Sequence, residues 1–457
     1  MKQPLSKPPI QGGSKRIWLA VIVVLYVFFA IAYNVVTPAA SLFQHNPDEN
    51  DHAKYVSVLA SGHLPVFTTA PAGSEFHQPP LYYLLCTPVY LATHGQGDSA
   101  AIHAMRAVST VLGLLLILAV YRCVRRLFPD EPWIALLSAG FVGLLPMNIA
   151  TNASVGNDSL TNLLVALGLM LTVDIAMTPE TDTIPARKPA LLGLVLGAVI
   201  LTKSSGLVLY PTVVVAFLAL AYRKAMPQST ALRCLGIALG IGLLIGCPWL
   251  LRNMSLYGDP LGQKVFNAAF KATTAPADAI IIGVHGFGNY VALMTKWTFA
   301  SFWGVFDSMT AFWGRDPHPV HSHVPPYPII GPPFDEPLAT VYNLLAVLTG
   351  MAIIGVVAGV KRAGVDVARS SILWSFLLLL LATAYGFAMF TMQFFQAQGR
   401  YWFTALVPLA VFFALGYRGL FAKETSYRVV SIVLILGLVA LNAYTIWGLL
   451  VPRFANS

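Results

Sequence analysis

Residues 16–36 read RIWLAVIVVLYVFFAIAYNVV, and the polar motif NPDENDH follows at 46–52. The first stretch is apolar after its leading arginine and is long enough to cross a bilayer as a helix. The second places three carboxylates and a histidine within five positions, in a chain of which only 10% of residues are charged. Ionisable groups beside the hydrocarbon are costly and usually serve a function. The two stretches therefore predict a membrane helix that leads into a functional loop.

The motif itself has the pattern of a helix start. Asn46 can cap the helix, and Glu49 stands where a capping box places its acid. In such a helix Asp48, Asp51 and His52 share one face, because they are three or four residues apart. The alternative is that the acids of the first turn only stabilise the helix, by their favourable interaction with the positive end of its dipole. That alternative accounts for one acid well and for three poorly.

The composition is typical of a polytopic helical membrane protein. The 457 residues are 57% hydrophobic, with a mean hydropathy of +0.70, whereas soluble domains are about half apolar and about a quarter charged. The net charge of +9 does not indicate a nucleic-acid partner, because the basic residues stand in short loops between apolar runs. The four cysteines form no CxxC pair, so they predict neither a disulfide framework nor a thiolate metal site.

Apolar runs recur along the whole chain, and we expect a single all-α membrane domain over 1–457 with about eleven spans. The expected spans are 16–36, 102–122, 132–152, 158–177, 189–203, 206–222, 232–250, 338–360, 371–391, 401–420 and 429–450. A further apolar patch at 290–305 is interrupted by Lys296. We expect this patch to be a surface helix, because counting it as a span would turn Lys361 and Arg362 outward.

The distribution of lysine and arginine predicts the orientation. A cytoplasmic N-terminus places most of the 28 basic residues inside. The first periplasmic loop, 37–101, then carries the acidic motif and an interfacial or re-entrant helix at 81–92. The long segment 251–337 and the C-terminus also face the periplasm. We therefore expect a multi-pass protein of the bacterial inner membrane.

Polar groups from several span ends converge on this outer face. They are Asp48, Glu49, Asp51, His52, His77, Gln78, Asp158, Lys203, Arg252, Arg400 and Tyr401. Simpler interpretations exist for some of them. Lys203 and Arg400 can snorkel to the headgroups, Asp158 can be a helix cap, and His77 can order the Pro-Pro turn that follows it.

Converging carboxylates and cations at a membrane face suit two chemistries. In transfer from a lipid phosphate, cations hold the anionic leaving group while a carboxylate deprotonates the incoming hydroxyl. In transport, carboxylates carry ions at broken helices near the midplane. The polar groups here lie at span ends on one side, which favours transfer. A transporter or flippase of lipid-linked sugars is the alternative, and a non-catalytic scaffold is a third.

An ordered series of short motifs resembles the GT-C superfamily, in the branch of the protein O-mannosyltransferases and the lipid A aminoarabinose transferase. The series consists of Asp48-Glu49, Pro79-Pro80-Leu81-Tyr82-Tyr83, Asn157-Asp158 and Thr202-Lys203. Four later motifs resemble a bacterial subgroup of that branch, namely Pro248-Trp249, Arg252-Asn253, Tyr257-Gly258-Asp259-Pro260 and Gln398-Gly399-Arg400-Tyr401. The similarity covers most of the chain.

The resemblance implies a GT-C-like fold and an inverting transfer outside the membrane, from a polyprenyl-phosphate-linked sugar to a lipid, glycan or protein acceptor. It implies catalytic roles for Asp48, as the base, and for Glu49. The implied substrate-binding residues are His52, His77, Tyr82, Asp158, Lys203, Arg252, Arg400 and Tyr401. A divalent ion (Mg, Mn or Zn) held by Asp48, Glu49 and Asp158 is a further expectation.

This chain departs from the aminoarabinose transferases at two positions of the first loop. Those enzymes carry basic residues near the positions that match Asp51 and Gln78, and this chain does not. We therefore expect the donor and acceptor to differ, and the phosphate contacts to shift to Lys203 and Arg400.

Overall fold

The computed structural model describes residues 12–39, 45–68, 74–179, 183–271, 277–307, 309, 311–313 and 339–455, and nearly all of them are helical. The first half contains α1 (Gly12–Val36), α2 (Glu49–Ala60), η1 (Ser74–His77), α3 (Leu81–Thr93), η2 (His94–Gln96), α4 (Asp98–Leu127), α5 (Pro132–Leu144), α6 (Pro146–Asn152), α7 (Asp158–Ala176), α8 (Arg187–Ile200), η3 (Ser204–Val208), α9 (Leu209–Tyr222) and α10 (Gln228–Tyr257).

The second half contains α11 (Gln263–Phe270), α12 (Ala277–Gly283), α13 (Phe287–Gly304), β1 (Val305–Phe306), β2 (Ala311–Phe312), α14 (Ala339–Arg362), α15 (Val367–Gln393), η4 (Gly399–Ala405), α16 (Leu406–Leu420), α17 (Glu424–Ala443), η5 (Tyr444–Leu450) and α18 (Val451–Phe454). The two strands pair antiparallel in one short hairpin. The expected outer segment at 251–337 lies outside the described residues from 314 onward.

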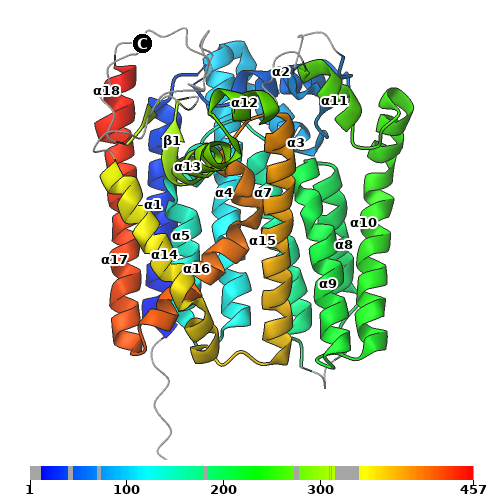
Figure 1. Ribbon diagram of the computed structural model, residues 1–457. Helices are drawn as coiled ribbons and strands as arrows, with labels where there is room; N and C mark the ends of the chain where they lie inside the picture. Colours follow the sequence, from blue (N-terminus) through cyan, green and yellow to red (C-terminus); the bar gives the residue numbers. More distant parts are fainter. Residues whose placement is uncertain are drawn as a thin grey trace, which may run out of the picture.

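The long helices stand side by side as one bundle, with the short helices α2, α3, α11 and α12 gathered at its upper end (Figure 1). Within the described residues, nine helices are long and apolar enough to cross a membrane, or up to eleven if each of two bent pairs is one span. This confirms the expected class, an all-α polytopic membrane protein. The long helices support the short helices and loops of the upper end.

Two expected spans differ from straight membrane helices. The span at 132–152 is the pair α5 and α6, which is bent by 59° at a break. The bend has a local cause, because Leu145 precedes Pro146 and is extended, as residues before proline tend to be. The span at 189–203 is α8, which has only 14 residues and rises about 21 Å, less than the hydrocarbon thickness.

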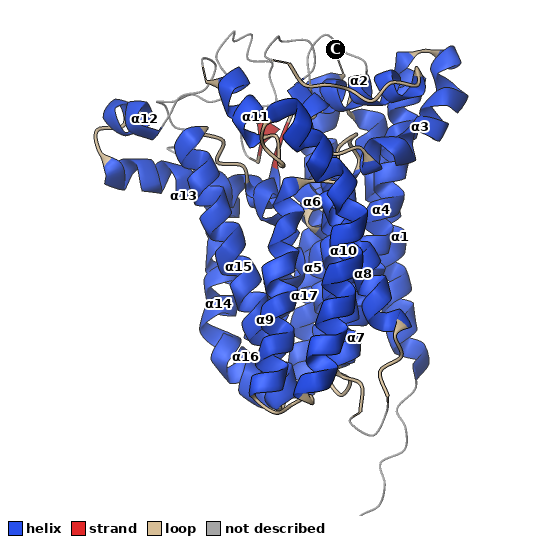
Figure 2. Cartoon of the chain, turned by 90° about the vertical axis from the view of Figure 1, so that its right-hand side faces the viewer, coloured by secondary structure: helices blue, strands red, loops and turns tan. Residues whose placement is uncertain are grey.

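The patch expected as a surface helix at 290–305 is part of α13. Helices α12 and α13 are bent against each other by 105°. They reach sideways from the upper end of the bundle, across the direction of the long helices (Figure 2). This placement agrees with the surface position that the sequence predicted. Ile282, near the end of α12, and Phe287, at the start of α13, are exposed.

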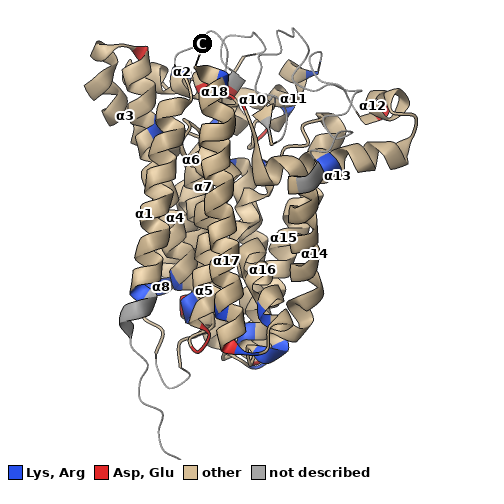
Figure 3. Cartoon of the chain, turned by 90° about the vertical axis from the view of Figure 1, so that its left-hand side faces the viewer, with Lys and Arg blue, Asp and Glu red and all other residues tan. Residues whose placement is uncertain are grey.

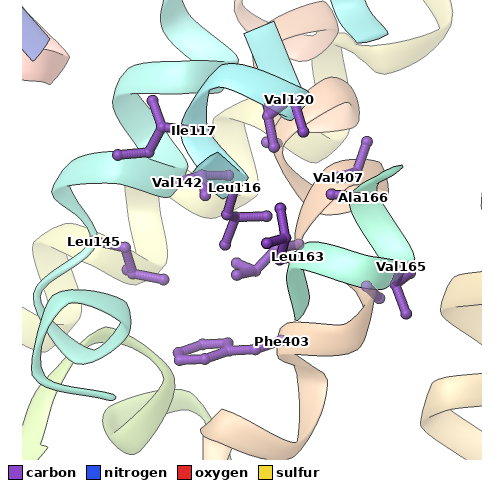
Figure 4. Close-up of a cluster of buried hydrophobic side chains, with 14 of the residues drawn as sticks. Leu116, Ile117, Val120, Val142, Leu145, Leu163, Val165, Ala166, Phe403 and Val407 are labelled. Atoms are coloured by element: carbon purple, nitrogen blue, oxygen red, sulfur yellow. The ribbon is translucent and has the colours of Figure 1, made fainter. Parts of the chain in front are cut away.

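The core of the bundle is built around α7. In its most apolar stretch, 78% of the residues are buried inside the protein, whereas the corresponding share in the peripheral helix α14 is 22%. Figure 4 shows part of this core, where Leu116 of α4, Leu163 of α7 and Phe403 of η4 belong to one buried cluster. In lipid, such helices are held by close packing rather than by the hydrophobic effect. A well-packed centre therefore fixes the start of α7 and the start of η4, both of which carry expected site residues.

Close backbone approach stabilises the pair α14 and α16. A Cβ atom added at Gly359 would lie 1.8 Å from the carbonyl oxygen of Leu415, and one at Gly416 would lie 1.9 Å from that of Ala352. Only glycine permits this contact, which is typical of helix pairs in membranes.

The two ends of the bundle differ in charge. Basic residues gather at the lower end, where α4 and α14 end and α8 and α17 begin (Figure 3). Helix α1 begins at this end, whereas α18 finishes at the opposite, upper end (Figure 1). The charged residues expected at the site lie toward the upper end, away from the basic one.

Candidate active site

The backbone of the acidic motif is strained at Asp48. We expected Asn46 to cap the first-loop helix, but this prediction was wrong, since α2 begins at Glu49 with Asp48 at the N-cap position. Asp48 has φ 61° and ψ 4°, the left-handed region, and its side chain makes no capping hydrogen bond. A non-glycine residue held there costs about 1–3 kcal/mol and is typical of functional sites. The carboxylate contacts Arg400 instead of the N–H groups of the helix.

That carboxylate belongs to a cluster of two acids and two cations. Arg400 Nη2 donates to Asp48 Oδ2 at 2.7 Å, and Arg400 Nη1 lies 3.7 Å from Asp158 Oδ2. Lys203 Nζ lies 2.6 Å from the other oxygen of Asp158. The side chain of Asp48 is 46% exposed, whereas that of Arg400 is 9% exposed. Asp48 is thus the accessible member of an otherwise buried group.

The charges around Asp48 keep it ionised. Burial raises the pKa of its carboxyl, but the attraction of Arg400, assisted by Lys203, outweighs burial and holds the pKa below its usual value. Burial lowers the pKa of His52, although Glu75 and Asp48 oppose this, so the imidazole is neutral at pH 7. His52 Nδ1 contacts the hydroxyl of Tyr83 at 2.8 Å. The site therefore offers an ionised carboxylate beside a neutral imidazole.

Glu49 lies apart from this cluster, although it is the neighbour of Asp48. Both of its oxygens are bonded to Arg106, at 2.8 Å from Nε and 2.6 Å from Nη2. One of them also accepts from the backbone N–H of Val155 at 2.9 Å. Arg106 in turn donates to the carbonyl of Thr37 at the end of α1. Glu49 thus joins α1, α2 and the turn before Asp158, and it holds Asp48 in place rather than facing a substrate.

Two other expected substrate-binding residues also have structural contacts. The hydroxyl of Tyr82 is buried, contacts Ser109 at 2.8 Å and accepts from the N–H of Gly156 at 2.9 Å. Arg252 donates to the carbonyl of Pro65 at 2.6 Å. Both residues fasten loops of the upper end, and neither lines the large cavity.

A cavity of about 630 Å³ brings the other expected residues together. Asp48, His52, His77, Lys203, Arg400 and Tyr401 line it, and Asp158 lies behind Lys203 and Arg400. The rest of the wall is largely apolar and comes from the end of α8, from η3 and from the long helices α10 and α15. It includes Ile200, Leu207, Val208, Leu250, Phe387 and Phe390. The cavity thus joins a charged end to an apolar groove between membrane helices.

The residues of this cavity do not fit the metal set that we expected. That set consisted of Asp48, Glu49 and Asp158. Glu49 is bound by Arg106 outside the cavity. The guanidinium of Arg400 contacts Asp48 and lies near Asp158, so a positive charge already stands between these two carboxylates. Within the described ranges, no group of three or more His, Cys, Asp or Glu side chains could hold an ion.

Three participants were not identified from the sequence. Arg106 interrupts the apolar span 102–122, and a charge within a span is a signal that could have found it. Glu75 lines the cavity from η1 but stands in a polar loop, where a single acid is unremarkable in sequence. Gln398 accepts a hydrogen bond from Arg400 Nε at 2.6 Å. The sequence placed Gln398 in a motif but predicted no role for its side chain.

Residues 77–251 match the family model described as dolichyl-phosphate-mannose-protein mannosyltransferase, which covers less than half of the chain. No curated protein matches the chain. Among solved structures, the chain is similar to the Archaeoglobus fulgidus oligosaccharyltransferase in complex with Zn and sulfate, at 14% identity and a TM-score of 0.54, over 95% of this chain and 53% of that one.

It is also similar to AglB of the same organism in complex with an inhibitory peptide and a dolichol-phosphate, at 15% identity and a TM-score of 0.54, over 97% of this chain and 56% of that one. ArnT from Cupriavidus metallidurans bound to undecaprenyl phosphate matches with a TM-score of only 0.40, at 16% identity over 89% of this chain and 78% of that one. The chain thus spans about half the length of the archaeal enzyme, and the likeness is one of fold.

Proposed function

We propose that the chain is a GT-C membrane glycosyltransferase, which moves a sugar from a polyprenyl-phosphate donor to an acceptor hydroxyl with inversion at the anomeric carbon. The match of residues 77–251 to the mannosyltransferase family model and the likeness of fold to the archaeal oligosaccharyltransferase support this proposal. The observation that carries the proposal is the position of Asp48. It is the exposed carboxylate of a buried ion-pair cluster, at the head of a cavity that continues between membrane helices.

In this mechanism Asp48 is the general base. Its ionised carboxylate takes the proton of the acceptor hydroxyl while the acceptor oxygen forms a bond to the anomeric carbon. The bond between that carbon and the phosphate oxygen breaks, and its electron pair leaves with the polyprenyl phosphate. A lost general base typically lowers the rate by about a hundredfold or more. Glu49 contributes by holding the start of α2, through its contacts with Arg106.

Arg400 and Lys203 stabilise the leaving phosphate. Both line the cavity, and both hold carboxylates in the resting protein, so their positive charges are already placed and desolvated. A guanidinium can bind a phosphate through two hydrogen bonds. Preorganised cations aimed at a developing anion are among the largest contributions to catalysis.

The apolar part of the cavity suits the prenyl chain of the donor. Leu207 and Val208 line it from η3, and Phe387 and Phe390 line it from α15, so a hydrocarbon chain bound there would contact apolar side chains. The basic end of the bundle lies opposite the site (Figure 3), which favours a cytoplasmic N-terminus and a periplasmic site in a bacterial inner membrane. Lipid, glycan and protein acceptors all offer the hydroxyl that the mechanism needs.

A reconstituted assay tests the proposal against the transporter alternative. Purified protein in liposomes would be given undecaprenyl-phosphate-linked hexoses, with an envelope extract as the source of acceptors. We expect release of undecaprenyl phosphate and appearance of the sugar on an acceptor. Passage of intact donor across the bilayer without cleavage would refute the glycosyltransferase and support a flippase.

A further inference from the structure

The wall of the large cavity contains a buried carboxyl that the mechanism above does not use. Glu75 in η1 lines the cavity, and its side chain is only 13% exposed. Its nearest titratable partner is His52, whose Nδ1 lies 4.0 Å from Oε2. Within the described part of the chain, no lysine or arginine nitrogen lies within ion-pair distance of this carboxyl. Buried carboxyls usually have such a partner.

The other acids of the site show the contrast. Asp48 is paired with Arg400, and Asp158 is paired with Lys203. Burial is the largest influence on Glu75 and raises the pKa of its carboxyl above the usual value, although His52, Lys203 and a hydrogen bond with the side chain of Gln78 oppose this. A polar group that is kept partly desolvated at a cavity wall is a candidate ligand-binding group.

The turn that carries Glu75 is held on both sides. The ring of Phe76 packs edge-on against that of Tyr55, with their centroids 5.8 Å apart. The ring of His77 lies between Phe67 and Phe266, at 5.4 Å and 4.7 Å. The carboxyl is therefore fixed in place before a ligand arrives, which is what recognition of a small polar group requires.

We propose that Glu75 recognises the donor sugar, by accepting hydrogen bonds from hydroxyl groups of an uncharged sugar, and that it excludes donors whose sugar carries a carboxylate. This inference rests on the proposed function and deepens it. With the phosphate bound by Lys203 and Arg400, the sugar attached to it lies in the same cavity as Glu75.

Hydroxyl groups suit this carboxyl in both of its protonation states. An ionised carboxylate accepts from O–H groups, and a protonated carboxyl both donates to and accepts from them. Glu75 can therefore bind a hydroxyl in either protonation state, and in its ionised form, which His52 and Lys203 favour, it also repels a carboxylate. A uronic acid would bring a further carboxylate beside those of Glu75, Asp48 and Asp51, with Lys203 and Arg400 already bound to the phosphate.

The test compares three lipids by equilibrium binding to purified protein in nanodiscs. The lipids are undecaprenyl phosphate, its mannose conjugate and its glucuronate conjugate. For Glu75→Ala we expect binding of the mannose conjugate to weaken about 10- to 100-fold, the usual scale for a hydrogen bond to a charged group, with no change for bare undecaprenyl phosphate. Asp98→Asn, an exposed acid at the start of α4, is the matched control.

The isosteric variant tests the exclusion. Glu75→Gln keeps hydrogen-bonding atoms and removes the charge, so it should bind the mannose conjugate nearly as well as the wild type and gain affinity for the glucuronate conjugate. Equal weakening of all three lipids in Glu75→Ala, or no weakening, would overturn the role in sugar recognition. No gain in Glu75→Gln would overturn the exclusion. A wild-type protein that binds none of the three lipids would instead overturn the proposed function.

Discussion

Replacing Arg400 by lysine separates the geometry of the site from its charge. The guanidinium contacts Asp48 at 2.7 Å and Gln398 at 2.6 Å, and it lies 3.7 Å from Asp158. One ammonium group cannot reach all three partners and still offer two hydrogen bonds to a phosphate. We expect Arg400→Lys to lose about 2–4 kcal/mol of transition-state stabilisation, or roughly 30- to 1000-fold in kcat/KM.

The pH profile gives a second, independent readout. Burial alone would raise the pKa of Asp48, and Arg400 is the main group that lowers it. The base must be ionised, so wild-type activity should persist at pH values below the usual carboxyl range. In Arg400→Ala the pKa of Asp48 should rise, because the positive charge and the hydrogen bond that lower it are lost, and the acidic limb of the rate profile should move to higher pH.

The assay is release of undecaprenyl phosphate from a sugar donor, measured across pH with folding checked by thermal melting. The matched control is Arg418→Lys. That arginine is 11% exposed and binds both oxygens of Glu131 at the opposite end of the bundle, so its loss should lower stability and leave the pH profile unchanged. Wild-type turnover and an unshifted profile in both Arg400 variants would show that this guanidinium only reaches toward the headgroups.

Three further outcomes follow from the fold. Glu49→Gln should lower the free energy of unfolding by about 3–5 kcal/mol, because it leaves a buried guanidinium half-paired; an unchanged melting temperature with activity that a chelator abolishes would instead favour a metal. Gly359→Ala should lower the melting temperature, because its Cβ would meet a carbonyl at 1.8 Å; an unchanged melt would contradict the close packing. In a Cys247→Ala background, Ser61→Cys should react with an impermeant thiol reagent in intact spheroplasts and Thr425→Cys only after lysis, and the reverse pattern would invert the orientation.

Hydropathy predicted the bundle because a chain that crosses a bilayer must hydrogen-bond its own backbone N–H and C=O groups. For a chain with apolar runs of this length, the helix is the structure that does so. Hydropathy did not predict the bend at Leu145, which depends on the proline that follows, or the shortness of α8. It also could not choose the surface position of α13 by itself. That choice depended on the charge distribution, which agrees with the sideways course of α12 and α13 (Figure 2).

The site was predictable in its members more than in their roles. Asp48, Lys203 and Arg400 stand at the ends of different helices, and these ends meet because they lie at the same end of the bundle. The separation of Glu49 from Asp48 was not predictable. It depends on the left-handed backbone at Asp48 and on Arg106, which lies 57 residues further along the chain.

The neighbouring acids Asp48 and Glu49 therefore have opposite expected phenotypes, although they are adjacent in sequence. Asp48 faces the cavity and holds Arg400, whereas Glu49 is enclosed by Arg106 and Val155. A substitution that keeps the shape of each side chain should lower activity at the first position and stability at the second. This difference is a direct consequence of the structure and not of the sequence motif.

The most direct measurement is the single-turnover transfer rate of Asp48→Asn, with donor binding measured on the same preparation. The amide keeps the shape of the side chain and removes its basicity, so we expect a folded protein that still binds undecaprenyl-phosphate-linked hexose and transfers it about a hundredfold or more slowly. Asp98→Asn should transfer at the wild-type rate. A wild-type rate in Asp48→Asn would contradict the assignment of Asp48 as the base.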